Sequence, residues 1–315
     1  VLSKVLYHCF APVVLGGVET SLRRLAHYDY WSDKVRRSIL LDAKADILVY
    51  GMGEKQVLEI AERLKRGHNI RTLDNIRGTV VVRNEIDALE DYIEIPPFQQ
   101  VVDNKDKFNK AFRILYSEFD PLRGKVIVQK HRDRFAIQFP PALPLTTEEM
   151  DRVYLLNYAR AWHPAYDKDG GVPGFETVRF SIVSHRGCPG ECSFCSLYMH
   201  QGRIIQSRSQ ESILKEAKAL TGRDDFRGTI TDIGGPTANT YKAECEFWKA
   251  KGACVDKKCL IPAKCKNLKL GNDETLKVWK AVMRIPKVKH LFIGSGVRYD
   301  LLVENQSEGY LKELC

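Results

Sequence analysis

The sequence lacks any apolar run that approaches the roughly 20 residues needed for a membrane-spanning helix. It also lacks a charged opening followed by a short apolar core, the pattern of a secretory signal peptide. These absences exclude a membrane-embedded protein and favour a cytoplasmic one. The 315 residues, 44% of them hydrophobic, suffice for a sizeable core and roughly two domains.

The sequence has little of the cysteine pattern that a disulfide framework would need. Such frameworks belong to short secreted chains, whereas seven of the nine cysteines here fall between positions 188 and 265. Clustered thiols in a chain of this size indicate metal binding, and we interpret Cys9 and Cys315 as ordinary thiols. His163 and His185 are potential ligands too, but an isolated histidine is more often packed or exposed without a metal.

Two glycine turns near the amino terminus each follow a strand-like run. Residues 12–15 precede Gly16 and Gly17, residues 46–50 precede a turn with Gly51, and a helical pattern follows each turn. These units predict an α/β fold with part of an open parallel, Rossmann-like sheet. Neither turn completes a dinucleotide fingerprint, so ordinary turn chemistry is favoured over ligand binding at these strand ends.

Three strand–helix repeats are predicted in the second half of the chain. Strand-like runs at 178–183, 229–233 and 288–293 alternate with helical patterns at 210–220 and 273–283. Polar or glycine-rich loops follow the strands, which predicts the first strand–helix units of a (β/α) partial barrel.

We divide the chain into three parts. They are a partial α/β amino-terminal domain (1–83), a connecting region (84–174) with a hairpin at 125–139, and a truncated barrel core (175–315). The chain opens at Val1 on a strand-like stretch and ends at Cys315 just after a helical pattern has begun. We therefore expect a fragment of a longer protein.

One short loop after the first of these strands carries three cysteines with the spacing Cys188-x3-Cys192-x2-Cys195. A four-iron cluster normally takes four cysteine ligands, so a loop that offers three leaves one iron open to another molecule. Zinc is the alternative, since it also takes closely spaced thiolates. A zinc site, however, usually takes four ligands from two separate pairs of closely spaced residues, whereas this loop supplies three ligands from one segment.

The cysteine spacing, with an aromatic residue before the third cysteine, resembles the radical S-adenosylmethionine (radical SAM) superfamily. Several stretches resemble one branch of it, the YgiQ-like proteins: HRG at 185–187, GRIIQSRS at 202–209, IGGPTAN at 233–239 and GVRYD at 296–300. Residues 12–54 resemble the amino-terminal domain of that family. The resemblance runs from about residue 12 to the end, with a divergent middle.

This resemblance implies an enzyme whose [4Fe-4S] cluster, held by Cys188, Cys192 and Cys195, binds S-adenosylmethionine at the open iron. One electron, from a donor such as a flavodoxin or ferredoxin, would cleave the cofactor to a 5′-deoxyadenosyl radical that attacks an unknown substrate. Residues that contact ribose and adenine would lie beyond Cys315, so this fragment alone is expected to be inactive. No DxHxxG-type cobalamin loop is present, which argues against a cobalamin role.

The resemblance also implies a set of cofactor-binding residues. Gly234 and Gly235, followed by Pro236, would meet the methionine amino group through backbone atoms, since glycine lets the backbone approach a ligand closely. Arg208 could reach a cofactor carboxylate, although the serines around it suit a helix start. Ser295 follows the third strand, where barrel enzymes place working residues. Arg298 and Asp300 lie nearby but could simply pair with each other.

A second group of thiols and a basic stretch follow the glycine motif. Cys245, Cys254, Cys259 and Cys265 suit a second iron–sulfur cluster or a structural zinc, with unconnected thiols as the alternative. Residues 241–289 hold 13 Lys or Arg against 5 Asp or Glu. The simplest interpretation is a solvated, lysine-rich face, and the alternative is a basic surface that binds RNA. The rival function is thus a metal-stabilised RNA- or protein-binding module, but such a module has no need of IGGPTAN beside an open-site cluster.

Overall fold

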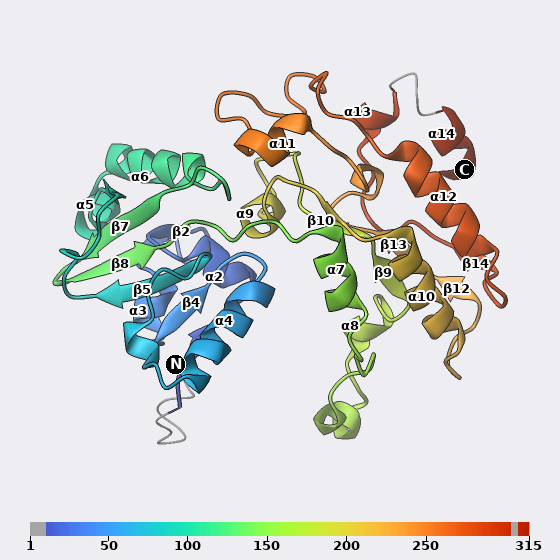
Figure 1. The fold of residues 1–315 in the computed structure, drawn as a ribbon, viewed down its shortest axis with the longest axis horizontal. Coiled ribbons are helices and arrows are strands. Elements are labelled where there is room, and N and C mark those ends of the chain that lie inside the picture. The colour runs from blue at the N-terminus through green and yellow to red at the C-terminus, as the bar shows by residue number, and fades with distance from the viewer. Residues whose placement is uncertain (1–10, 304–307, 315) are drawn as a thin grey trace. The chain divides into compact units, whose positions relative to one another are not determined.

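The computed structural model describes residues 11–303 and 308–314, which form two compact units (Figure 1). Of the described residues, the first unit comprises 11–143 together with Cys192–Gly202 and Lys251–Val255. The second comprises Pro144–Glu191, Arg203–Ala250, 256–303 and 308–314. Within the described ranges, no helix is long and apolar enough to cross a membrane.

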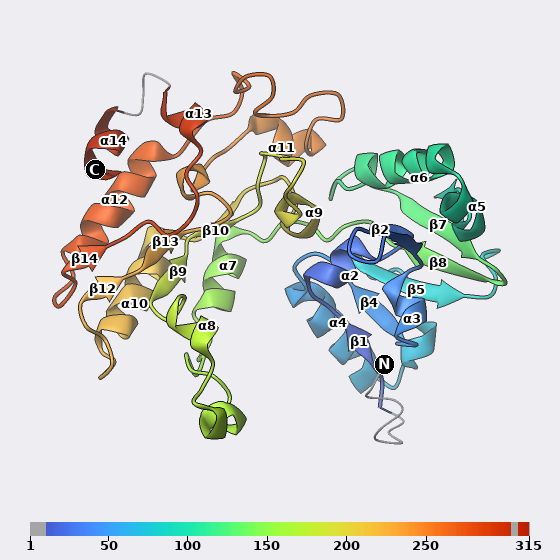
Figure 2. The same cartoon turned by 180° about the vertical axis from the view of Figure 1, so that it is seen from behind.

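The first unit is built on a six-stranded sheet with the order β1-β4-β5-β8-β7-β6. The β1–β4 and β6–β7 pairs are parallel, and the other three pairs are antiparallel. Figure 2 shows β1 beside β4 from behind. The strands are β1 (Val14–Leu15), β4 (Ile47–Val49), β5 (Thr79–Arg83), β6 (Tyr92–Ile95), β7 (Val126–His131) and β8 (Arg134–Gln138).

Both faces of this sheet are covered. Leu48, Val80 and Ile127 face one hydrophobic cluster, while their strand neighbours Val81 and Val128 face another. Alternation with period two, in strands rich in β-branched residues, explains why one sheet serves two cores. The covering elements of the first unit are α2 (Val18–Leu22), α3 (Ile39–Asp42), α4 (Glu54–Lys65), α5 (Phe98–Asp103), α6 (Lys105–Ser117) and α9 (Leu197–Gln201), with the β2 (His27–Asp29) and β3 (Lys34–Arg36) hairpin and the 3-10 turn η1 (Ile70–Thr72).

The α/β class is confirmed, with a sheet that is partly parallel. The strand at 46–50, the helix after it and the hairpin at 125–139 are confirmed as β4, α4 and the β7–β8 pair. The structure differs from the expected division at residue 84. Strands β6, β7 and β8 pair into the same sheet, so the first part of the supposed connecting region belongs to the amino-terminal unit. The short loop between β7 and β8 makes this pair antiparallel. The two glycine turns near the amino terminus indicated parallel strands only, so the sheet is more mixed than expected.

The second unit contains the predicted strand–helix alternation. Strand β9 (Ser181–Val183) pairs in parallel with β13 (Asp232–Gly234), and β12 (Thr229–Ile230) pairs in parallel with β14 (His290–Leu291). Helix α10 (Gln210–Thr221) links β9 to β12, and α12 (Asn272–Met283) links β13 to β14. Ile182, Ile213 and Ile233 lie in the common core. The first strand–helix units of a (β/α) barrel are therefore present, and both strand pairs, β9–β13 and β12–β14, are parallel.

The remaining elements of the second unit are short. They connect the parallel strands or flank them in Figure 1. They are α7 (Thr147–Tyr154), η2 (Pro164–Asp169), α8 (Pro173–Glu176), β10 (His185–Arg186), β11 (Gln206–Ser207), η3 (Ala238–Thr240), α11 (Glu246–Lys251), α13 (Tyr299–Leu302) and α14 (Glu308–Leu314).

Candidate functional site

The carboxyl ends of β9 and β13 meet around a buried histidine. His185 is 1% exposed, and its Nδ1 lies 2.8 Å from Ser184 Oγ. Its Nε2 lies 3.1 Å from the Thr237 carbonyl oxygen and 3.0 Å from Thr240 Oγ1. Burial lowers the pKa of His185 to about 4, so the ring is neutral at physiological pH. His185 therefore ties strand ends together, as expected for a packed histidine rather than a metal ligand.

The glycines of the IGGPTAN stretch are required by close packing. A Cβ on Gly235 would lie 2.6 Å from the His185 carbonyl oxygen and 2.8 Å from its ring. A Cβ on Gly234 would lie 2.1 Å from Ser295 Oγ. Pro236 follows them directly. Both glycines therefore allow protein atoms to approach the backbone closely, and their contact with a cofactor stays a prediction.

Ser295 lies next to a carboxylate that the sequence reasoning missed. Its backbone N donates to Asp232 Oδ1 at 3.1 Å, and its Oγ donates a short hydrogen bond to Asp232 Oδ2. An acidic residue inside a strand, two positions before a glycine pair, was the available signal for Asp232. Arg298 and Asp300 pair with each other at 2.5 Å, as expected.

Arg208 needs a correction. Its side chain is fully buried, and its Nη1 donates to Glu216 Oε2 at 2.5 Å and to the Val183 carbonyl at 2.8 Å. Nε and Nη2 donate to Ser212 Oγ at 3.1 and 2.8 Å, and Nη2 also reaches the Ser212 carbonyl at 3.0 Å. All five N–H groups of the guanidinium are thus engaged. The expected contact of Arg208 with a cofactor carboxylate is therefore wrong, because the side chain serves the core.

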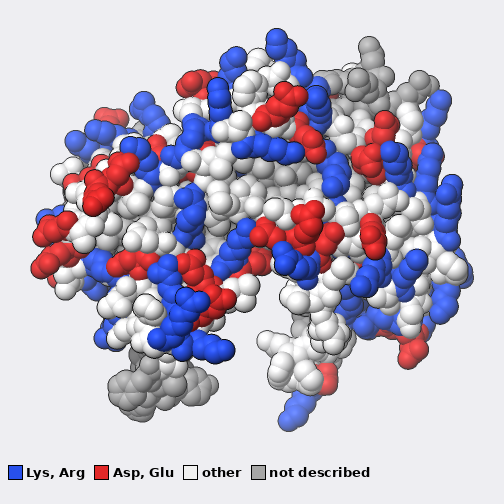
Figure 3. Space-filling view, viewed as in Figure 1, with Lys and Arg blue, Asp and Glu red and all other residues white. Residues whose placement is uncertain are grey.

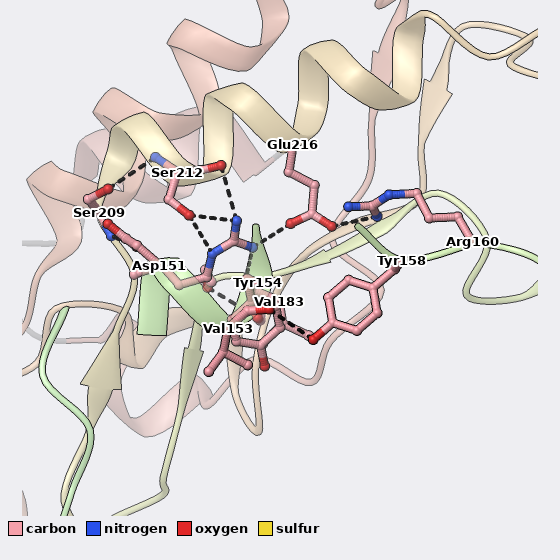
Figure 4. Close-up of polar contacts among 12 residues, drawn as sticks. Asp151, Val153, Tyr154, Tyr158, Arg160, Val183, Ser209, Ser212 and Glu216 are labelled. Carbon is pink, nitrogen blue, oxygen red and sulfur yellow. Dashed lines mark hydrogen bonds and ion pairs between the residues drawn. The ribbon is translucent and has the colours of Figure 1, made fainter. Parts of the chain in front are cut away.

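Figure 4 shows the carboxylate at the centre of this buried network. Glu216 also accepts from Arg160 Nη1 at 2.7 Å, so one carboxylate balances two guanidinium groups. Ser209 accepts from the backbone N of Ser212 at 3.0 Å, which confirms that a serine caps α10. Arg208 precedes the N-cap Ser209, so the sequence carried no helical spacing signal for its pair with Glu216.

The three-cysteine loop is divided between the units. Cys188 belongs to the second unit, and Cys192 and Cys195 belong to the first. Each of the three is half-buried. The backbone N of Cys195 donates to the Cys192 carbonyl at 3.0 Å, and the backbone N of Leu197 reaches Cys195 Sγ at 3.5 Å. The last two cysteines therefore sit in one tight turn that leads into α9.

No group of three or more His, Cys, Asp or Glu side chains lies close enough to hold a metal ion in the described ranges. The chemistry of the donor set nevertheless fits a [4Fe-4S] cluster, because its irons take cysteine thiolates and this loop supplies three. Phe194, the aromatic residue before the last cysteine, is 91% exposed. It contributes little to the hydrophobic core.

The segment after the cysteines is anchored to the first unit. Ser21 Oγ lies 2.8 Å from His200 Nδ1 and accepts from the backbone N of Gly51 at 2.9 Å. Met199 is buried in the core, and the ring of Tyr198 packs edge-on against Tyr116 at 6.0 Å. Helix α9 thus occupies the carboxyl end of β4, where a ligand could otherwise bind. Neither Ser21 nor His200 carried a recognisable signal in the sequence.

The later cysteines are also divided between the units. Cys254 lies in the segment Lys251–Val255 of the first unit, while Cys245, Cys259 and Cys265 belong to the second. The backbone N of Cys265 donates to the Cys259 carbonyl at 2.8 Å. Cys9 and Cys315 lie outside the described residues.

The Cys254 segment is held by a buried carboxylate. Asp120 is fully buried and accepts from the backbone N of Ala253 at 2.7 Å. Arg123 Nε donates to the Lys251 carbonyl at 2.8 Å. A Cβ on Gly252 would lie 2.2 Å from Asp120 Oδ1, so the glycine is needed for this contact. The sequence offered no reason to connect Asp120 with the cysteines.

The basic stretch carries acidic neighbours. Three lysines form ion pairs with glutamates, measured from Nζ to Oε1. The distances are 2.7 Å for Lys277–Glu274, 2.8 Å for Lys280–Glu313 and 3.4 Å for Lys269–Glu246. Figure 3 shows Lys and Arg interspersed with Asp and Glu on the face in view. These lysines are partly neutralised, as the solvated-face interpretation expects.

Known proteins resemble this chain over most of its length. The family described as Radical SAM N-terminal matches residues 2–181. A UPF0313 protein from Clostridium botulinum (strain 657 / Type Ba4) is 50% identical over 305 residues, covering 97% of this chain and 48% of the relative. A UPF0313 protein from Methanocella arvoryzae is 51% identical over 304 residues, covering 96% of this chain and 50% of the relative. The chain spans about half the length of these curated relatives.

Among solved structures, the radical S-adenosylmethionine methyltransferase TsrM from Kitasatospora setae matches with a TM-score of 0.36 and 20% identity. The match covers 73% of this chain and 30% of that enzyme. A likeness at this level establishes no shared architecture.

Proposed function

The chain belongs to the Radical SAM N-terminal family, within the YgiQ-like branch of the radical SAM superfamily, and from this premise we propose that it is part of a radical SAM enzyme. Cys188, Cys192 and Cys195 would hold its [4Fe-4S] cluster. The observation that carries the proposal is the three-thiol loop within a chain of this family.

When bound, such a cluster supplies one electron to S-adenosylmethionine, whose cleavage yields a 5′-deoxyadenosyl radical for hydrogen abstraction. A reduced flavodoxin or ferredoxin is the class of electron donor that this chemistry requires. The protein contributes binding, orientation and exclusion of water.

The chain's own residues prepare the strand ends for this role. Asp232 fixes Ser295 through two hydrogen bonds, and this pair packs against Gly234. Neutral His185 holds the Thr237 loop without adding charge. We propose that Gly234, Gly235 and Pro236 offer backbone atoms to the cofactor and that Ser295 lines the same site. The fixed backbone at these strand ends supports this assignment.

We also propose a second metal site on Cys245, Cys254, Cys259 and Cys265. Four thiols in 21 consecutive positions suit an iron–sulfur cluster or a zinc ion equally well. Metal analysis of a Cys188→Ala, Cys192→Ala, Cys195→Ala triple variant should find residual iron or zinc. A well-folded triple variant that contains neither iron nor zinc would contradict the second metal site.

The alternative, an RNA- or protein-binding module without radical chemistry, has weaker support. It rests on the basic stretch 241–289, where Lys269, Lys277 and Lys280 each lie beside a glutamate. Partly neutralised lysines release few counterions on binding a polyanion. The acidic neighbours therefore favour the enzyme over the binding module.

The experiment is anaerobic reconstitution of the chain with iron and sulfide, followed by iron analysis and absorption spectroscopy. Cys192→Ala should lose the cluster of the three-cysteine loop, because a single loop cannot replace one of its three thiolates. Cys9→Ala is the matched control, since it removes a thiol that we interpret as ordinary and assign to neither cysteine group. Equal iron loss in the two variants, or none in Cys192→Ala, would contradict the proposal.

A further inference from the structure

A pocket of about 650 Å³ opens on the first unit between α5 and the β7–β8 hairpin. Its wall includes the apolar side chains of Leu41, Phe98 and Val102. Arg37 and Arg134 contribute charge to the same wall. The volume is that of pockets that hold small organic ligands. No cysteine is among the described residues that line it, so the pocket is separate from the proposed cluster loop.

A buried histidine lines this pocket without a hydrogen-bond partner. His131 is 4% exposed, and neither Nδ1 nor Nε2 of its ring has a hydrogen-bond partner among the residues that the structure describes. Its ring stacks on Phe98 with 5.2 Å between the ring centres. A buried polar group without a hydrogen-bond partner destabilises the fold, and native proteins retain few such groups. A ligand that reaches this ring would remove that destabilisation.

The ring is neutral. Burial lowers the pKa of His131 to about 4, and Arg37 and Arg134 act in the same direction while Asp42 opposes them. A neutral imidazole offers one donor and one acceptor. His131 can therefore take a hydrogen bond from, or give one to, a polar group that enters beside Phe98.

Arginines are the most numerous charged residues in the lining of the pocket. Three arginines line it, namely Arg37, Arg132 and Arg134, against the carboxylates of Asp103 and Asp133. Arg37 is itself ion-paired with Asp42. Arg132 has a φ of 59°, the left-handed region that a long side chain rarely adopts. The two-residue hairpin loop holds this backbone, and strain of this kind is concentrated at functional sites.

We propose that this pocket binds a small organic oxyanion, a phosphate or carboxylate attached to a compact apolar group. Arg132 and Arg134 hold the oxyanion, the apolar group packs against Phe98 and Leu41, and His131 forms a hydrogen bond with the ligand. The combination of arginines in the lining, an apolar wall and an unpartnered buried ring carries the proposal. It does not depend on the cluster.

The test is a titration of the reconstituted chain at roughly physiological salt with phenyl phosphate, benzoate and inorganic phosphate, followed by calorimetry and by NMR of the His131 ring nitrogens. At least one aromatic probe should bind and shift the His131 resonances. Stronger binding of phenyl phosphate than of benzoate assigns the site to phosphates, and the reverse order assigns it to carboxylates. Inorganic phosphate should bind more weakly than phenyl phosphate, because it lacks the apolar group.

Arg134→Gln should weaken the tighter probe about tenfold, and His131→Phe should weaken it while the fold is retained. The matched control is Arg66→Gln, an exposed arginine of α4's carboxyl end that lies outside the pocket. It should leave the affinity unchanged. No binding by either aromatic probe at millimolar concentration, or equal weakening by Arg134→Gln and Arg66→Gln, would overturn the proposal.

Discussion

Two buried histidines, one in each unit, are both neutral but differ in the hydrogen-bond partners of their ring nitrogens. His185 is 1% exposed and His131 is 4% exposed, and burial lowers the pKa of each to about 4. The ring of His185 contacts Ser184, Thr237 and Thr240 through its nitrogens. The ring of His131 has no hydrogen-bond partner.

This difference separates a residue that holds the fold from one that is available to a ligand. The closed network of His185 joins the ends of β9 and β13, so its polar atoms are already satisfied by the protein. The ring of His131 keeps its hydrogen-bonding capacity and lines a pocket. Equal burial and equal pKa values therefore do not imply equal roles, and hydrogen-bond partners decide between them.

The largest expected effect comes from forcing a side chain against His185. Gly235→Ala should destabilise the protein by about 2–3 kcal/mol, because the new Cβ overlaps the His185 carbonyl and ring. Gly296→Ala is the control, since no atom lies within 4 Å of its added Cβ. Denaturant unfolding measures both changes. Equal stabilities of the two variants would show that the packing around His185 is not tight.

Replacing each histidine by phenylalanine tests the comparison directly. His185→Phe should cost about 2 kcal/mol, since buried hydroxyl and carbonyl groups lose their partner. His131→Phe should be close to neutral, because it removes two unsatisfied polar atoms and keeps the stacking on Phe98. Unfolding free energies at pH 7.5 give the answer, and a larger loss in His131→Phe would reverse our comparison.

The two rings should behave alike toward acid. Their folded pKa values lie below the ordinary value of 6.5, so the unfolded chain binds protons first as pH falls. Their contribution to stability is complete above about pH 6.5 and is lost as the pH falls toward 4. At pH 5.5 the loss should be about 1 kcal/mol for each ring. Stability measured from pH 7.5 to 5 should fall less in either phenylalanine variant, and an unchanged slope would contradict the neutral assignment.

The smallest expected change in stability concerns a third histidine, His200, which also belongs to the first unit. His200 Nδ1 and the backbone N of Gly51 share the hydroxyl of Ser21. Ser21→Ala should cost about 1 kcal/mol and should increase proteolytic cleavage in residues 192–202. Ser117→Ala is the control, because that hydroxyl bonds a carbonyl of its own helix. Equal cleavage in the two variants would mean that Ser21 does not anchor the cysteine segment.

The sequence predicted the elements with strong periodicity and not the contacts that join distant segments. Helices α10 and α12 were expected within one or two residues, because their apolar spacing is a local property. The inclusion of β6 to β8 in the first sheet depends on pairing between segments far apart in the chain. Local patterns cannot encode that pairing.

The same limit applies to the candidate site. The glycine pair and Ser295 were found from motifs, whereas Asp232 and Ser21 act through partners 63 and 179 positions away. Arg208 was misjudged because its burial and its ion pair with Glu216 are tertiary properties.

Electron paramagnetic resonance of the reduced, reconstituted chain tests the central claim most directly. An open iron beside Cys188, Cys192 and Cys195 should bind S-adenosylmethionine, so its addition should shift the g-values of the cluster. The shift should be absent in Cys192→Ala and present in Cys245→Ala. A fully loaded cluster whose spectrum does not change with S-adenosylmethionine would contradict the account and leave the cluster a structural role.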